Sequence, residues 1–574
     1  MLGYTLMKNT YFLNLVLLIG LLSSGVMAKD QSDGFAGPYL AAKNALSHSN
    51  FSTASNYYKK VLNKDPTNLT LLSEALFSSI GQGDFENAIK IAKHYVLIGG
   101  ESNASNLILD SSLIAKGDFR SVLVSINKVG RTNPLTDRLV KAWALIGNGE
   151  MAQAKLEFSK ISKNINFRQQ ARYHEALAVA MVGDFEEAEE ILSGRKYGII
   201  DLDVRGIEAY VQILIQVSKS KLALELVEAE LLKSYNSNFN LIDLKSKIKE
   251  NSVIEYDFIT NSKQGIAEVY LTIAKLLQNR VELNQVLLLS RIAEYLRPGY
   301  PAITLQVASV LEDLQQYGLA LDSYSSVTQN SPNYILAELG RANTLALLNK
   351  KEVSVEVLKS LSKKHYNHVI VHSALGNMLR ETDRNIEAIE AYSTAIELAN
   401  FKKQPRWSIY FYRGILYEKQ KNFLKMESDF RAALKLSPNQ PDVLNFLGYA
   451  LVEQREKLPE ALQMIKMAVS EKPKSGYIID SLGWIYYRLA KYQEAVGPLE
   501  RAVELLPVDP IVNDHLGDVY WKVGRQREAK FQWKRSLSFF PNEVDAKRIR
   551  QKLKLGLDVV LETEKLIETK TEND

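Results

Sequence analysis

A spacing of about 34 residues runs through most of this 574-residue chain and limits its fold more than any other feature. Small or apolar residues recur at this spacing, and twelve of the thirteen intervals between them are 32 to 38 residues long. A period of this length is typical of helix–turn–helix arrays, in which each helix pair buries its apolar face on the next. The recurring positions are Ala54, Ala88, Val122, Ala154, Ala188, Ala223, Val286, Ala320, Ser354, Ala388, Met426, Ala461, Ala495 and Ala529.

The side chains around these positions also recur at fixed offsets. In residues 476–507, Gly483 stands where the first helix must pass close to the second, Ala495 opens the second helix, and Pro507 ends it. This is the pattern of the tetratricopeptide repeat (TPR). We therefore predict an all-α fold, a TPR superhelical solenoid of about fourteen helix–turn–helix repeats in two segments.

The first 28 residues predict a secretory signal peptide. Lys8 precedes an apolar run from Tyr11 to Leu22, and Val26-Met27-Ala28 is a small-x-small cleavage pattern. The apolar run is shorter than the roughly 20 residues that a membrane-spanning helix needs. We expect cleavage after Ala28, a periplasmic location with possible outer-membrane association, and no stable membrane span afterwards; an uncleaved anchor is the alternative.

The composition excludes several functional classes. The chain has no cysteine, so disulfides, thiol nucleophiles and thiolate metal sites are absent. The formal net charge is +5, which does not favour nucleic acid as a partner. Between Tyr520 and Gly556 the chain is more basic, with eleven Lys or Arg and three Asp or Glu. This stretch predicts a solvated capping helix, and an electrostatic footprint for an anionic partner is the alternative.

The interval of 63 residues between Ala223 and Val286 predicts a break in the array. Residues 231–263 are polar and lack helical periodicity, apart from a short helix near Leu241 to Lys249. The predicted organisation is a signal peptide (1–28), an N-terminal TPR solenoid (29–230), an irregular connector (231–263), a C-terminal TPR solenoid (264–541), a capping helix (542–560) and a polar tail (561–574). A degenerate repeat without any break is the alternative for the connector.

Residues 441–541 carry a more specific resemblance. The strings NFLGYALVEQREKLPEAL, GYIIDSLGWIYYRLAKYQEAVGPLERAVEL and NDHLGDVYWKVGRQREAKFQWKRSL resemble the exported TPR proteins of Gram-negative bacteria. Some members of that group are outer-membrane lipoproteins that serve as adaptors for a periplasmic carboxyl-terminal processing protease. This chain has no cysteine to carry a lipid. The resemblance implies a non-enzymatic scaffold of the cell envelope.

No sequence motif indicates catalysis. The chain contains no Gly-x-Ser-x-Gly, P-loop or HExxH motif. His365, His368 and His372 have spacings that would suit a metal only if they shared one helix, and no carboxylate lies nearby in the sequence to orient them. We therefore expect no enzyme activity, no catalytic residues, no metal site and no cofactor.

The concave groove of the C-terminal repeats is the candidate binding surface. Counting from the glycine of each first helix places aromatic, amide and charged side chains on this face, a mixture that suits peptide recognition. The alternative for the two tryptophans is packing against the adjoining helix. The predicted partner-binding residues are Asn445, Tyr449, Asp480, Trp484, Tyr487, Arg488, Asp514, Asp518, Trp521 and Lys522.

These features together predict a protein–protein interaction scaffold or adaptor in the bacterial cell envelope. The expected partners are envelope proteins or peptides, with a periplasmic protease or a cell-wall hydrolase as examples. One alternative is an assembly factor for polysaccharide export or for an outer-membrane machine. An alternative of another class is an enzyme that acts at the concave face.

Overall fold

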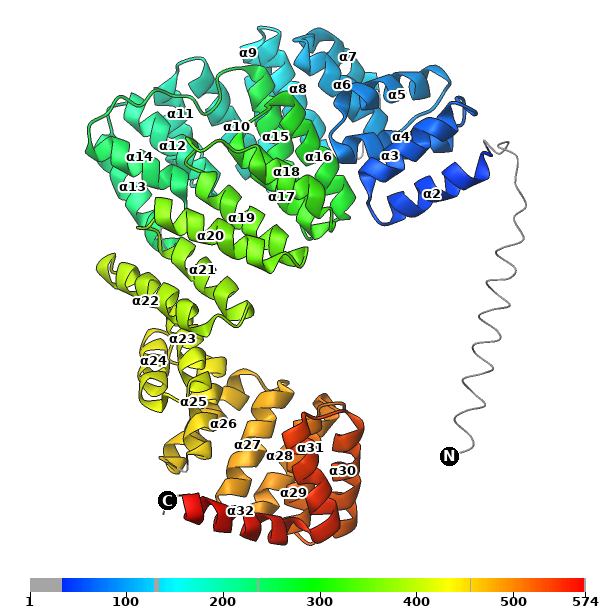
Figure 1. The fold of residues 1–574 in the computed structure, drawn as a ribbon. Coiled ribbons are helices and arrows are strands. Elements are labelled where there is room, and N and C mark those ends of the chain that lie inside the picture. Colours follow the sequence, from blue (N-terminus) through cyan, green and yellow to red (C-terminus); the bar gives the residue numbers. More distant parts are fainter. Residues whose placement is uncertain (1–33, 129–133, 235–236, 455, 572–574) are drawn as a thin grey trace. The chain divides into compact units, whose positions relative to one another are not determined.

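The computed structural model describes residues 34–128, 134–234, 237–454 and 456–571 (Figure 1). The predicted signal peptide lies outside the described residues. Within them the regular structure is entirely helical, without strands. Each of the fourteen recurring positions falls in a helix of its own, and each of these helices follows another helix. The prediction of an all-α TPR solenoid with about fourteen repeats is therefore confirmed.

The recurring residues are the most tightly packed points of the array. All fourteen are at most 1 % exposed. Glycines face bulky side chains across the same seams: a Cβ at Gly517 would stand 2.5 Å from Cδ1 of Trp533. Because a Cβ there would require the two helices to move apart, the repeat needs glycine where its helices approach most closely.

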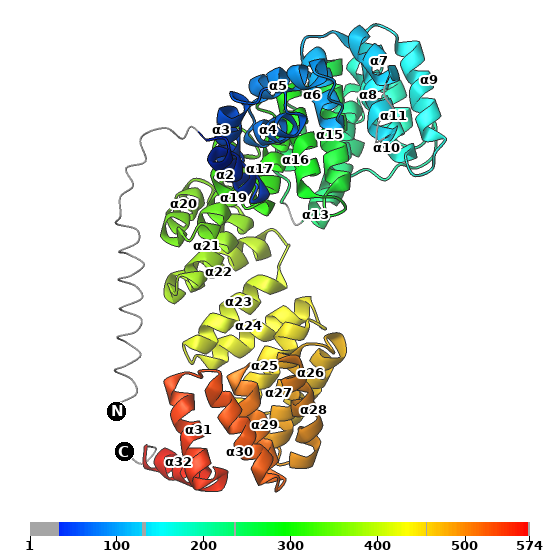
Figure 2. The ribbon, with the colours of Figure 1, turned by 90° about the vertical axis from the view of Figure 1, so that its right-hand side faces the viewer.

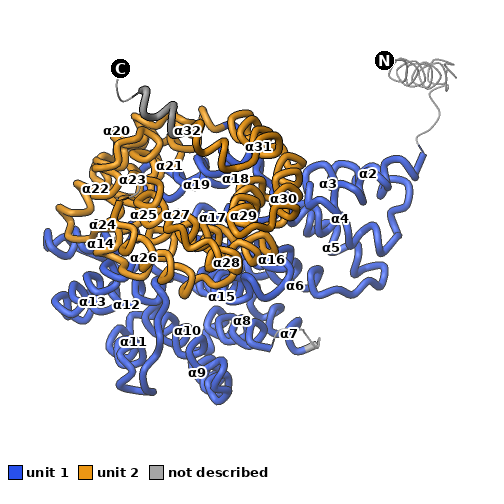
Figure 3. Tube along the Cα trace, turned by 90° about the horizontal axis from the view of Figure 1, so that it is seen from below, with its two compact units in different colours: residues 1–350 blue, residues 351–574 orange. Residues whose placement is uncertain are grey.

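The chain forms two compact units, residues 1–350 and 351–574 (Figure 3). The first contains the helices α2 (Ala36–Ser47), α3 (Phe51–Leu62), α4 (Leu69–Gln82), α5 (Phe85–Leu97), α6 (Asn103–Ala115), α7 (Phe119–Lys128), α8 (Pro134–Gly147), α9 (Met151–Ser162), α10 (Arg168–Met181), α11 (Phe185–Leu192), α12 (Val204–Gln216), α13 (Ser220–Lys233), α14 (Phe239–Lys249), α15 (Ser262–Leu277), α16 (Leu283–Leu296), α17 (Pro301–Asp313), α18 (Tyr317–Ser325) and α19 (Tyr334–Leu347).

The second unit contains the helices α20 (Lys351–Lys364), α21 (Val369–Glu381), α22 (Asn385–Phe401), α23 (Trp407–Lys419), α24 (Phe423–Leu436), α25 (Pro441–Glu453), α26 (Leu458–Glu471), α27 (Gly476–Arg488), α28 (Tyr492–Leu505), α29 (Pro510–Lys522), α30 (Gln526–Ser538), α31 (Glu543–Leu555) and α32 (Leu557–Thr571).

The segment predicted as a connector, residues 231–263, lies within the first unit and does not join the two units. It contains the end of α13, all of α14 and an irregular stretch before α15. Helices α15–α19, which the sequence assigned to the C-terminal solenoid, belong to the same unit as α2–α14. The boundary between the units lies at residues 350–351 instead.

The two helices after the connector cover the inner face of the first array. Helix α15 packs against α8 and α10, and α16 packs against α4 and α6 (Figures 1 and 2). The Trp143 ring of α8 fills the space where Gly265 of α15 has no side chain. Phe85 stacks on Tyr295 with ring centroids 4.5 Å apart. This part of the first unit's groove is therefore filled by the chain itself.

A buried ion pair fixes α15 against the same face. Arg205 of α12 and Glu268 of α15 form two hydrogen bonds of 2.6 and 2.9 Å, and the Tyr173 hydroxyl donates a third to Glu268 at 3.0 Å. Burial would raise the pKa of Glu268, but the Arg205 guanidinium outweighs it and lowers this pKa to about 2. Glu268 is therefore ionised, and the pair specifies the register of α15 against α12.

The end of the second unit differs from the prediction of one capping helix and a polar tail. Residues 543–571 form two helices, α31 and α32, separated by Gly556 in a left-handed conformation (φ +84°). Leu557 and Val560, at the start of α32, are buried, and this helix extends into the predicted tail as far as Thr571. No helix in the described ranges is both long enough and apolar enough to cross a membrane.

Candidate functional site

All ten predicted partner-binding residues lie in the second unit. They lie on the first helices of three consecutive repeats, α25, α27 and α29. The structure divides them into two groups. The polar side-chain atoms of six bond to other side chains of the protein at 3.0 Å or less, and the other four, all half-buried, lack such bonds.

Trp484 belongs to the occupied group. Its side chain is 8 % exposed and lies between two rings, with centroids 4.7 Å from Tyr487 and 3.9 Å from His515. Its indole Nε1 donates to Glu453 at 2.7 Å. The expectation of an aromatic ring open to the groove needs correction here, because α29 of the next repeat covers Trp484.

Asp480 is occupied by the same neighbour. Its carboxylate lies 3.0 Å from His515 Nδ1, and Asp480 is 6 % exposed. Burial opposes protonation of His515, but the Asp480 carboxylate outweighs it and raises the pKa of this histidine. The pair links α27 to α29 and is not available to a partner in this conformation.

Asp514 and Asp518 are occupied by Lys552 of α31. The Lys552 ammonium is fully buried and lies 2.6–3.0 Å from all four carboxylate oxygens. Burial, followed by the Asp518 charge, raises the pKa of Asp514. The basic C-terminal stretch was expected to be solvated or to contact an anionic partner. Lys552 does neither, because acidic side chains of the preceding repeat enclose it.

Trp521 and Lys522 contact the last helix. The Trp521 indole donates to Asp558 at 2.9 Å, and the Lys522 ammonium pairs with the same carboxylate. Trp521 also lies against Gly556, where a Cβ would stand 2.6 Å from the indole. Helices α31 and α32 thus cover the concave face of the last complete repeat.

The partly exposed group defines what we call the open groove: Asn445 and Tyr449 of α25, and Tyr487 and Arg488 of α27. The Arg488 guanidinium makes one long contact, 3.4 Å to the Glu453 carbonyl. The Oδ1 atom of Asn445 is buried and has no hydrogen-bond partner in the described chain. Burial raises the pKa of both tyrosines, so their hydroxyls remain protonated donors. An amide, two phenols and a guanidinium suit a peptide backbone and a carboxylate, and their role in binding stays a prediction.

Arg380 of α21 was missed by the sequence analysis. It stands four residues after Gly376, the same offset that selected Tyr487 and Trp521. Its guanidinium lies 4.8 Å from the Tyr412 ring centroid, and its Nε atom is buried without a partner among the described residues. Applying the offset to the earlier repeats would have found it.

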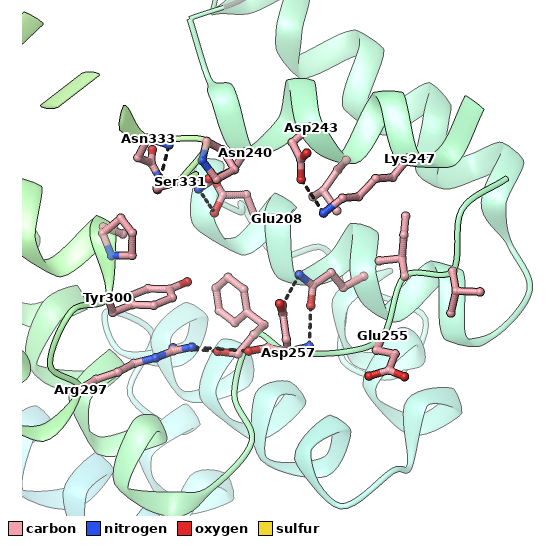
Figure 4. A pocket seen from close by; sticks show the side chains of 18 residues that line it. Glu208, Asn240, Asp243, Lys247, Glu255, Asp257, Arg297, Tyr300, Ser331 and Asn333 are labelled. Carbon is pink, nitrogen blue, oxygen red and sulfur yellow. Dashed lines mark hydrogen bonds and ion pairs between the residues drawn. The ribbon is translucent and has the colours of Figure 1, made fainter. Parts of the chain in front are cut away.

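The first unit contains a separate polar cavity of about 620 Å³ (Figure 4). It lies between α12, α14, the irregular stretch before α15, and the starts of α17 and α19. Gln212 fixes the irregular stretch through two bonds to Asp257, one to the carboxylate at 2.8 Å and one from the amide at 3.1 Å. Arg297 lies 3.5 Å over the Tyr300 ring and donates to the Phe258 carbonyl at 2.8 Å. No periodic signal in the sequence indicated this cavity.

The three histidines considered for a metal do not converge. The His365 and His368 ring centroids are 6.3 Å apart, while His372 Nε2 lies 2.8 Å from the Tyr366 carbonyl. In the described part of the chain, no group of three or more His, Asp or Glu side chains is placed to hold a metal ion.

Comparisons with known proteins agree with the fold. The family model described as a tetratricopeptide repeat matches residues 408–440, which contain α23 and α24. A TPR repeat-containing protein of Pseudomonas aeruginosa (PA4667) is 26 % identical over 182 residues, 31 % of this chain and 30 % of that protein. Human tetratricopeptide repeat protein 13 is 27 % identical over 187 residues, 32 % of this chain and 21 % of that protein. The chain thus spans less than a third of the length of either curated relative.

Matches to solved structures have low TM-scores. The crystal structure of the APC/C hetero-tetramer Cut9-Hcn1 matches with a TM-score of 0.39 at 17 % identity, covering 91 % of this chain and 96 % of that chain. A tetratricopeptide repeat protein from Parabacteroides merdae matches with a TM-score of 0.35 at 15 % identity, covering 45 % of this chain and 98 % of that one. The chain is thus similar in part to tetratricopeptide repeat proteins, which generally mediate protein–protein interactions.

Proposed function

We propose that this protein is a non-enzymatic scaffold of the bacterial cell envelope that binds a partner protein in the open groove of its second unit. The observation that carries the proposal is the open groove itself. It combines the half-buried Tyr449 and Tyr487 with Arg488 and with Asn445, one turn before Tyr449 on α25. Aromatic and arginine side chains are the residues that most often dominate the energy of protein interfaces.

Two sequence features support the envelope as the location. Residues 11–22 form an apolar run that ends before a small-x-small pattern, as in exported proteins. The chain has no cysteine, which suits an exported protein whose stability comes from stacked repeats instead of disulfides. We therefore propose a periplasmic location for the repeats.

The open groove favours a peptide segment over a small substrate. The groove follows the first helices of successive repeats, and its polar groups lie on different helices. We propose that the partner is an envelope protein, with a protease or cell-wall hydrolase as the first class to test. The absence of a recognisable catalytic motif in the sequence supports a role without chemistry.

A capture experiment tests the proposal. The full chain and its Arg488→Glu variant are each used to capture proteins from a bacterial envelope extract, and captured proteins are quantified by mass spectrometry. Reversing the charge of a groove anchor should weaken the specific partner by at least about thirtyfold, since a hot-spot side chain is worth about 2 kcal/mol or more. Arg527→Glu on α30, whose arginine is exposed, is the matched control and should leave capture unchanged.

The identity of the captured protein separates the candidate tasks. A protease or cell-wall hydrolase supports the adaptor role, whereas components of a polymer-export machine support an assembly factor. Equal capture by the wild-type chain and the Arg488→Glu variant would refute the open groove as the binding surface.

A further inference from the structure

Near the end of the second unit, α30 and α31 present a row of exposed cations each. The two helices lie side by side (Figures 1 and 2). Only residues 539–542 join them, and so short a loop makes them antiparallel neighbours. Within each row the cations stand three or four residues apart, the spacing of one helix face. They are Arg527, Lys530 and Lys534 on α30, and Lys547, Arg550 and Lys554 on α31.

The two rows border one helix junction. Trp533 of α30 and Ile549 of α31 are buried in the same hydrophobic cluster. Lys534 directly follows Trp533, and Arg550 directly follows Ile549. In antiparallel helices, side chains that directly follow facing core positions lie on the same side of the junction. The two rows therefore adjoin and form one surface.

The protein neutralises little of this positive charge. Arg550 pairs with Glu543 at 3.2 Å, and the other five cations have no ion-pair partner among the described residues. Glu528, which is the single carboxylate of α30, pairs with Arg525 instead. A cluster of unpaired cations raises the local positive potential and attracts anions.

Exposed apolar side chains stand among these cations. Phe531 lies in the α30 row and is 63 % exposed, and Phe540 lies in the loop between the helices and is 91 % exposed. On α31, Val544 and Leu555 are 78 % and 50 % exposed. We call the six cations and these four apolar residues the terminal surface.

The backbone at Phe540 shows that this ring is not placed for packing. Its φ is +53°, a left-handed conformation that disfavours bulky side chains. Twelve non-glycine residues of the described chain have a positive φ, and the other eleven are Ser, Asn, Gln, Asp, Lys or Ala. An aromatic ring at this position neither fills the core nor eases the turn, so the fold alone does not explain it.

This combination of side chains fits the surface of an anionic lipid bilayer. Lys and Arg contact the lipid phosphates, while apolar side chains enter the boundary between head groups and acyl chains. A soluble polyanion would explain the cations only, because it offers no apolar phase to Phe531 and Phe540. The lipid surface accounts for both kinds of side chain.

We propose that the terminal surface binds anionic phospholipid bilayers and holds the second unit on a membrane. The proposal rests on the proposed envelope location, which brings the chain close to bilayers. It does not depend on the open groove. It also needs no lipid attached to cysteine, which the chain lacks.

A fluorescent label on the terminal surface tests the proposal. Because the chain has no cysteine, Ser538→Cys on the exposed face of α30 allows one NBD label, whose emission shifts to shorter wavelengths in an apolar environment. The labelled full chain is titrated with vesicles of equal parts phosphatidylcholine and phosphatidylglycerol. The emission should shift with these vesicles and not with phosphatidylcholine alone.

A second label position excludes contact elsewhere on the chain. The same label at Ser470→Cys, an exposed position of α26, should not shift with either kind of vesicle. Each label reports on its own surroundings, so lipid contact of the apolar run at residues 11–22 would not by itself shift the label at position 538.

Variants separate the electrostatic contribution from the apolar one. Lys530→Gln combined with Lys547→Gln should weaken binding to the anionic vesicles by roughly twenty-five-fold, about fivefold for each cation. Phe531→Ala should weaken it by about tenfold, because the ring no longer leaves water. These side chains are exposed, so thermal melting should be unchanged.

Matched controls come from exposed residues elsewhere in the second unit. Lys421→Gln combined with Lys435→Gln, and Phe401→Ala at a ring that is 87 % exposed, should leave vesicle binding unchanged. Arg488→Glu should also bind vesicles like the wild type. Failure of the terminal surface and failure of the open groove are therefore separate results.

Three outcomes would overturn the proposal. The first is an unchanged emission of the label at position 538 with anionic vesicles. The second is an equal shift with phosphatidylcholine alone, or an equal shift of the label at position 470. The third is loss of binding in the lysine variant together with full binding by Phe531→Ala, which would assign the surface to a polyanion instead of a bilayer.

Discussion

Removing the charge of Lys552 should release the end of the second unit. This ammonium is fully buried, and its contacts of 2.6–3.0 Å to Asp514 and Asp518 connect α31 to α29. In Lys552→Met the methionine keeps most of the apolar volume but leaves Asp514 and Asp518 with only the more distant Arg548 guanidinium, at 3.7–3.8 Å, as a counter-charge. Breaking a buried pair in this way typically costs about 3–5 kcal/mol.

Hydrogen exchange of the full chain is the suitable assay. Repeat arrays open locally, so a single unfolding midpoint would average over events elsewhere in the chain. A loss of about 3–5 kcal/mol should accelerate exchange of the α31 amides by roughly two to three and a half orders of magnitude. Amides of the first unit should not change. Lys554→Met is the matched control, because Lys554 lies on the same helix and is exposed.

The stability lost in Lys552→Met should depend on pH in a definite direction. Burial and the Asp518 charge already raise the pKa of Asp514 against the effect of Lys552, so removing Lys552 should raise the Asp514 pKa further above its unfolded value. The folded variant then binds more protons than the unfolded chain, so its stability rises as the pH falls. The difference in exchange between variant and wild type should therefore shrink as the pH falls from 7 towards 4.

A rescue experiment completes the argument. Adding Asp514→Asn and Asp518→Asn to Lys552→Met removes the unpaired charges, and the asparagine oxygen at 518 can still accept the Trp533 indole, which donates to Asp518 at 2.9 Å. Much of the lost protection should return. If Lys552→Met exchanges like Lys554→Met, or if lowering the pH leaves their difference unchanged, then the buried pair does not hold α31 in place.

Three further predictions concern buried contacts between helices. Trp484→Ala should lower the stability of the second unit by about 3–5 kcal/mol, as for a core tryptophan, which thermal melting would show as an early transition. Arg205→Met should destabilise the first unit by a similar amount, because it removes the cation paired with Glu268. In the wild type, the lowered pKa of Glu268 adds to the free energy of unfolding above the unfolded pKa near 4.3, and this stabilisation is lost as the pH falls towards about 2. Urea titrations at several pH values can follow the loss. The raised pKa of His515 stabilises the folded state fully below its unfolded pKa near 6.5, and this stabilisation is lost as the pH rises through its folded pKa. Asp480→Asn should abolish this pH dependence, which hydrogen exchange of α27 and α29 would show.

The repeat fold could be predicted because its contacts are local and periodic. Each recurring residue packs within its own helix pair or against the next one, so a spacing of about 34 residues carries most of the information. For example, the position of Gly517 in the period predicts its close approach to Trp533. Most of the helix pairs follow from this rule alone.

The covering of the inner faces could not be predicted in the same way. Arg291 of α16 donates to the Gly81 carbonyl of α4 across 210 residues, and Tyr173 meets Glu268 across 95. Such contacts are not repeated along the chain, so they leave no period in the sequence. The packing of α15 and α16 against the earlier helices was missed for this reason.

The candidate groove shows the same division between local and long-range information. The offset from glycine placed Asp514, Asp518 and Trp521 on the first helix of their repeat, where the structure has them. Whether that helix is open depends on α31 and α32, where the sequence predicted one capping helix (542–560) and a polar tail (561–574). The register of a residue on a helix is therefore predictable, and its availability to a partner is not.

In both units, later helices cover part of the earlier repeats. In each unit, some first helices have their concave side covered by later helices of the same chain, by α15 and α16 in one and by α31 and α32 in the other. The open groove adjoins the covered stretch of the second unit, so the buried Lys552–Asp518 pair holds its wall in place before any ligand arrives. A preformed wall lowers the ordering cost of binding. Weakening the Lys552–Asp518 pair should therefore reduce binding at the open groove, although neither residue belongs to that groove.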